Sequence, residues 1–144
     1  MGKQINITRR EFQNSCKNHY YLYRTADYSI SPKSRRLLLF YAVECGLKSL
    51  IMKNIGKNTY EELKKYSEEQ GKRIHGHDLK AMAQEMGIEH KYSLRRIHLA
   101  KEGECAPDRY NELWRYGATV ADEEEEIKAE KTLLGIAEWI EQRL

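Results

Sequence analysis

Two charged side chains interrupt the most apolar segment of the chain. Residues 37–52 read LLLFYAVECGLKSLIM, and within them Glu44 precedes Lys48 by four positions. This spacing places both side chains on one face of a helix, where they can form an ion pair. A helix that is apolar on nearly all sides is expected to be buried, and burying a charge is costly unless a partner compensates it. The pair is therefore either an internal strut or part of a site.

The densest set of reactive side chains lies in the segment KRIHGH. Lys72 and Arg73 supply two cations, and His75 and His77 supply two imidazoles. Together they could surround a phosphate, with His77 acting as a general acid or base near neutral pH. Alternatively, His77 stands at the start of a helix beside Asp78, and the other three side chains belong to a solvated loop.

The two histidines of this segment also raise the question of a metal site. His75 and His77 can both reach a metal ion in an extended loop, but a structural zinc site needs two further ligands. The chain has neither paired cysteines nor an HExxH motif to supply them. Its glycines are scattered singly, whereas a loop that cradles phosphate needs several together. No metal and no cofactor are predicted.

Arg115 and Tyr116 follow Trp114 in a segment that is expected to form a short helix. In one interpretation, Trp114 anchors the segment in the core and Arg115 pairs with an acid such as Glu44. In the other, Arg115 and Tyr116 line a polar pocket together with Glu44 and Lys48. Both interpretations bring the segment close to the charged pair of the apolar helix.

Two pairs of adjacent arginines are the strongest candidates for phosphate contacts with a nucleic acid. They are Arg35 with Arg36, and Arg95 with Arg96. The alternative is that each pair lies at a solvated helix end.

The net charge of +3 conceals an uneven distribution. Residues 1–50 carry a net charge of +6, residues 51–100 carry +3, and residues 101–144 carry −6. A basic first half with an acidic end is compatible with binding an anion, including a nucleic acid. It is equally compatible with attraction between the two ends inside one fold.

Composition indicates a globular protein. The chain has 144 residues, of which 40% are hydrophobic and 33% charged, and this fits a single domain over residues 1–144. No uncharged apolar run is long enough to span a membrane, and the N-terminal segment has no signal-peptide core, so we expect a cytoplasmic protein. Its three cysteines are far apart and predict no disulfide.

Start and stop signals predict an all-α bundle of five or six helices. Thr8 with Glu11, and Thr59 with Glu62, each fit a capping box. The expected helices cover residues 8–26, 32–53, 59–71, 77–87, 107–116 and 123–143, and a further one is considered at 91–101. The first two are long and should form an antiparallel pair on which the shorter helices pack.

Three motifs occur in an order that resembles the HEPN domains of prokaryotes. They are YAVECGLKSLIM at 41–52, GHDL at 76–79, and RYG at 115–117 before a final amphipathic helix. The resemblance implies a bundle of four to six helices that usually forms a symmetric dimer. Family roles include metal-independent RNase toxins, nucleotide-binding modules and non-catalytic subunits of defence or toxin–antitoxin systems.

The chain departs from the motif of the RNase branch, in which an arginine is followed after four to six residues by a histidine. Only three residues separate Arg73 from His77, and Arg95 and Arg96 lie still closer to His98. Lys72 has the required separation from His77, but lysine lacks the planar fork of arginine. The resemblance therefore favours the binding branch.

Three functions are open at this point. The first is a HEPN-like homodimer that binds RNA, a nucleotide or a partner protein from the same operon without clear catalysis, in a prokaryotic defence or toxin–antitoxin system. The second is an atypical RNase in which His77 works with Arg73 or Arg115. The third is a structural adaptor subunit of a larger complex.

Overall fold

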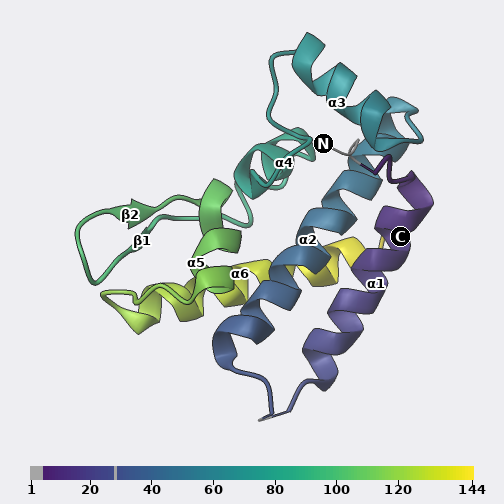
Figure 1. The fold of residues 1–144 in the computed structure, drawn as a ribbon. Coiled ribbons are helices and arrows are strands. Elements are labelled where there is room, and N and C mark those ends of the chain that lie inside the picture. Colours follow the sequence, from purple (N-terminus) through teal and green to yellow (C-terminus); the bar gives the residue numbers. More distant parts are fainter. Residues whose placement is uncertain (1–4, 28) are drawn as a thin grey trace.

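The computed structural model describes residues 5–27 and 29–144, so the first four residues of the N-terminal segment lie outside the described residues. The chain is an all-α helical bundle with one small hairpin, which confirms the predicted fold class (Figure 1). Its elements are α1 (Arg9–Thr25), α2 (Pro32–Ile55), α3 (Tyr60–Glu69), α4 (Leu79–Glu85), β1 (Ile97–His98), β2 (Glu104–Cys105), a 3-10 turn (Pro107–Arg109), α5 (Tyr110–Tyr116) and α6 (Glu123–Glu141).

The helix starts follow the capping signals of the sequence. Thr8 and Thr59 each accept a hydrogen bond from the backbone N–H three residues on, and the carboxylates of Glu11 and Glu62 accept from the backbone N–H of the cap residue, which completes both capping boxes. Asp78 caps α4 in the same way by accepting from the backbone N–H of Ala81. These side chains satisfy N–H groups that have no partner inside the helix.

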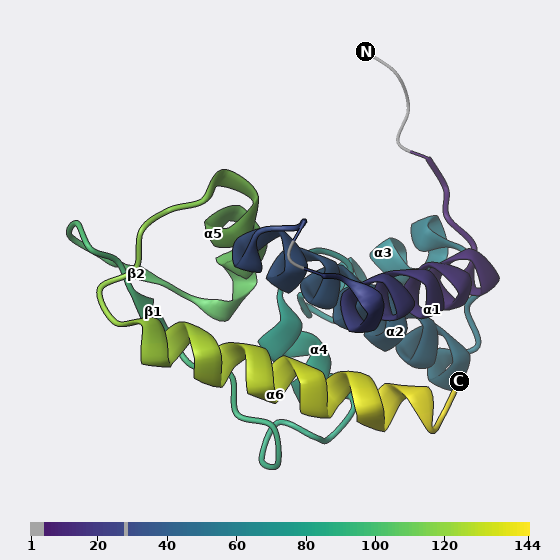
Figure 2. The ribbon, with the colours of Figure 1, turned by 90° about the horizontal axis from the view of Figure 1, so that it is seen from below.

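Helix α2 is the centre of the bundle. It lies beside α1 as an antiparallel pair, and it also contacts α6, α5 and α4 (Figures 1 and 2). Every residue from 42 to 52 is buried, which agrees with the apolar sequence. At Gly46 an added Cβ would lie 2.8 Å from Cys16 Sγ and 2.7 Å from Ile140 Cγ2, so the missing side chain allows α1 and α6 to pack closely on α2.

The helix considered at residues 91–101 is absent, and that prediction is wrong. In its place the chain forms a loop and an antiparallel hairpin in which Ile97 pairs with Cys105 and His98 with Glu104. The hairpin lies at the end of the molecule that also holds α5 and the start of α6 (Figures 1 and 2). Its strands have two residues each. A strand of this length is too short to produce an alternating sequence pattern.

Candidate functional site

Glu44 is a buried carboxylate of α2 with two charged or ionisable partners, Lys48 and His77. Its side chain is 8% exposed, and that of Lys48 is 5% exposed. Lys48 Nζ lies 3.3 Å from Glu44 Oε2, and Nδ1 of His77, from the loop before α4, lies 2.5 Å from Glu44 Oε1. The buried carboxylate therefore links two side chains that approach it from different elements.

Aromatic rings complete the surroundings of the Lys48 ammonium group. Its Nζ lies 5.6 Å from the ring centre of Phe12 on α1 and 6.0 Å from that of Tyr60 on α3. Ring faces attract a cation, and this attraction is larger where water is excluded. With one carboxylate and two rings as neighbours, Lys48 ties α1, α2 and α3 together.

His77 combines a fixed orientation with access to solvent. Its side chain is 54% exposed, although Nδ1 is held by Glu44. Because a carboxylate can only accept, Nδ1 carries the shared proton, and Nε2 is the nitrogen that remains for other partners. The ring of Phe40 lies 6.4 Å away and tilted by 48°. An imidazole oriented by a carboxylate has the arrangement of a general base.

A second histidine, His19, lies where α1 packs on α2. The ring of His19 on α1 packs on that of Tyr41 on α2 with centres 5.8 Å apart. Its Nδ1 is buried without a hydrogen-bond partner among the described residues. Burial lowers the pKa of His19, and the charge of Glu44 opposes this effect. The packing of His19 on Tyr41 has no local signal in the sequence, because it arises from the pairing of α1 with α2.

The four residues of the KRIHGH segment do not surround a common point. Lys72 Nζ binds Glu85 Oε1 at 2.7 Å, and His75 Nδ1 lies 2.8 Å from the hydroxyl of Ser67. The pKa of His75 is lowered, mainly by burial.

Arg73 Nη2 lies 3.3 Å from Asp108 Oδ2, and Arg73 Nε lies 3.7 Å from Asp78 Oδ2. With His77 on Glu44, each side chain of the segment thus has its own partner.

Arg115 and Tyr116 are not joined to the Glu44 centre. Both are exposed at the end of α5, and the ion-pair partners that the structure places on Glu44 are Lys48 and His77. Trp114 is buried, and its indole N–H donates to Glu126 at 2.9 Å. The structure therefore bears out the anchoring by Trp114, but it forms neither an Arg115–Glu44 pair nor a shared pocket.

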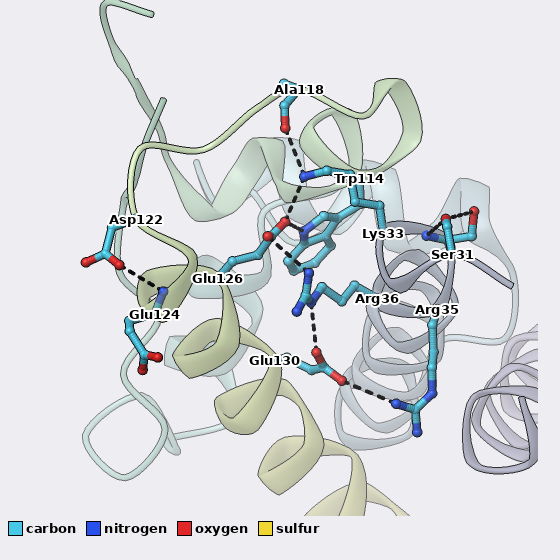
Figure 3. A network of polar contacts seen from close by, with 11 residues as sticks. Ser31, Lys33, Arg35, Arg36, Trp114, Ala118, Asp122, Glu124, Glu126 and Glu130 are labelled. Atoms are coloured by element: carbon cyan, nitrogen blue, oxygen red, sulfur yellow. Dashed lines mark hydrogen bonds and ion pairs between the residues drawn. The ribbon is translucent and has the colours of Figure 1, made fainter. Parts of the chain in front are cut away.

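Arg35 and Arg36 take part in a network that fastens α6 to α2 (Figure 3). Arg36 is 14% exposed and binds Glu126 at 3.0 Å and Glu130 at 2.8 Å. Arg35 lies 3.9 Å from Glu130, and Lys33 binds Glu126 at 3.1 Å.

The network accounts for much of the uneven charge distribution of the sequence. Basic residues of the first half face acids of the last helix inside the fold. Arg36 could contact a phosphate only by leaving these two carboxylates.

Arg95 and Arg96 have a different setting from the other predicted basic residues. Both are exposed in the loop before β1. Arg96 makes one ion pair of 3.3 Å with Glu104, and this pair is itself solvent-exposed. The Arg95 side chain makes no ion pair or hydrogen bond with the described residues. Of the predicted phosphate contacts, this pair is therefore the one that the fold leaves accessible.

Comparison with models of known families, with curated proteins and with solved structures finds no match for the chain. Within the part of the chain that the structure describes, no helix combines the length and apolar character needed to cross a membrane.

Proposed function

We propose that this chain is a HEPN-like helical bundle that binds RNA or a nucleotide without catalysing a reaction on it. The observation that carries the proposal is the accessibility of Arg95 and Arg96. They extend from an exposed loop, and Arg95 has no carboxylate partner among the described residues. Phosphate, like carboxylate, can bind an uncompensated guanidinium group through two parallel hydrogen bonds.

The Glu44 centre supports a binding role more than a catalytic one. Both carboxylate oxygens are engaged, and Lys48 is enclosed with them. Arg73, the nearest predicted cation in sequence to His77, is occupied by Asp78 and Asp108. Cleavage of a phosphodiester needs a cation or other donor free to stabilise the charge that develops on phosphate.

The resemblance to HEPN domains adds the setting of this proposal. On this resemblance we propose that the chain acts in a prokaryotic defence or toxin–antitoxin system, as a homodimer with a partner protein from the same operon. Light scattering during gel filtration tests the dimer, because a monomeric mass at all concentrations would contradict it.

Binding is tested with the purified chain and a mixed RNA pool. We expect retention that weakens steeply with salt, because phosphate binding releases counterions. The Arg95→Ala/Arg96→Ala variant should retain less RNA at every salt concentration. The proposal is wrong if the wild-type protein retains no RNA and no nucleotide. It is also wrong if the amount retained changes neither with salt concentration nor with the Arg95→Ala/Arg96→Ala substitution.

A second function, that of a metal-independent RNase, is favoured by one observation. His77 is half-exposed, and its orientation is set by a buried carboxylate. This function predicts RNA cleavage that persists in chelator and is lost in His77→Ala, with exposed His90 changed to Ala as the matched control. Intact RNA with wild-type protein, or equal cleavage by wild type and His77→Ala, would exclude a role for His77.

A further inference from the structure

Arg95 and Arg96 form one wall of a groove whose other wall is α6. The groove has a volume of about 560 Å³, and Lys128, Lys131 and Thr132 of α6 face it. Four cations line it against one carboxylate, that of Glu125. In the sequence the two lysines follow the acidic run of residues 122–126, so they do not stand out as a basic cluster. The excess of positive charge therefore becomes visible only when the loop and the helix are seen together.

The backbone of the loop that carries Arg95 and Arg96 is anchored in the core. Leu94 and Ile97 on either side of the two arginines are buried at 4% and 1% exposure. The hydroxyl of buried Tyr110 donates a hydrogen bond to the backbone carbonyl of Arg95. The backbone that carries the two guanidinium groups is thus fixed by buried contacts, so only the arginine side chains must be ordered when a ligand binds.

The helix wall follows from the spacing of residues on α6. Lys128 and Thr132 are four residues apart and share one face of the helix, and Lys131 flanks them. The small side chain of Ala129, which also lines the groove, leaves room between the helix and the loop. Helix α6 thus presents two ammonium groups, one turn apart, along the length of the groove.

Three of the four cations in the groove form no ion pair with the residues that the structure describes, and the fourth, Arg96, pairs with Glu104. The Glu125 carboxylate already accepts from the backbone N–H of His98 at 3.0 Å and faces the ring Nδ1 at 2.9 Å. Lys128 and Lys131, like Arg95, form no ion pair with the residues that the structure describes. In contrast, Lys33, Lys72 and the arginines of the α2–α6 network are all paired with acids.

We propose that this groove binds the sugar–phosphate backbone of a single RNA strand. The inference rests on the proposed function, and it adds the place of binding and the form of the ligand. Cations on both walls and along the helix can contact successive phosphates, which a mononucleotide does not offer. The only aromatic side chain in the lining is Tyr110, which is 0% exposed, so bases find no ring on which to stack. Binding is therefore independent of base sequence.

The test compares two double variants that change the net charge equally. Lys128→Glu/Lys131→Glu reverses the helix wall, and Lys64→Glu/Lys65→Glu reverses two exposed lysines of α3 as the matched control. Fluorescence anisotropy with a labelled RNA of about 12 nucleotides gives Kd across about 50 to 200 mM salt. Circular dichroism melts of both variants establish that they are folded.

For the groove variant we expect affinity to fall at least about tenfold and the slope of log K against log salt to fall by about 1.4, which is two single-strand phosphate contacts. The control variant should stay close to wild type in both quantities. If RNA affinity falls equally in both variants, or falls in neither while the wild type binds RNA, the groove is not the binding site, but the proposed function stands. No RNA binding by wild type would overturn both. If a mononucleotide competes as well as the strand does, the proposal that the ligand is an RNA strand is wrong.

Discussion

Replacing Glu44 by Gln should destabilise the fold strongly, because it leaves Lys48 as an uncompensated charge in the core. The two side chains are 8% and 5% exposed, and their charged atoms are 3.3 Å apart. At an effective dielectric constant of about 20, this separation corresponds to an attraction of about 5 kcal/mol. Measured losses on breaking buried pairs are about 3–5 kcal/mol. We expect the free energy of unfolding to fall by about 3 kcal/mol or more.

Urea denaturation followed by circular dichroism at about pH 7 measures this change. Glu68→Gln, on the exposed face of α3, is the control and should stay within about 0.5 kcal/mol of wild type. The double variant Glu44→Gln/Lys48→Met removes both charges, so it should recover most of the loss. A loss below about 1 kcal/mol for Glu44→Gln, or a double variant no more stable than the single one, would refute the interpretation of the pair as a buried strut.

Two further predictions concern packing and pH. Gly46→Ala should cost about 1–3 kcal/mol, because the new Cβ overlaps side chains of α1 and α6, whereas Gly76→Ala meets no atom within 4 Å and should be nearly neutral in the same urea titration. The pKa of His98 is raised from 6.5, chiefly by its hydrogen bond to Glu125. A raised folded-state pKa stabilises the protein fully below pH 6.5, and this stabilisation is lost as pH rises through the folded value. The Tm advantage of wild type over His98→Gln should therefore shrink with increasing pH, and an advantage that grows would contradict the assignment.

Helix positions were predictable where the signal is local. Capping boxes at Thr8 and Thr59 involve residues three apart, and the ion pair of Glu44 with Lys48 depends on a spacing of four. The approach of His77 to Glu44 spans 33 positions, and no local pattern of the sequence indicates it.

Contacts between distant segments explain what the sequence did not show. Leu94 in the loop and Ile97 at the start of β1 are buried three residues apart, a spacing that also fits a helix and so does not distinguish the two. Arg36 looked like a free cation, because its partners Glu126 and Glu130 lie 90 or more positions away. Which basic residues remain free is a property of the folded molecule, and sequence alone does not contain it.

Mapping of RNA contacts by amide chemical shifts is the most direct test of the central claim, that the chain binds RNA through the groove between the loop before β1 and α6. At 17.0 kDa the protein suits such a titration. If the groove binds RNA, the shifts on addition of a short RNA strand gather at residues 93–96 and 125–132. Shifts that gather around His77 and the start of α4, or that are absent at saturating RNA, would contradict it.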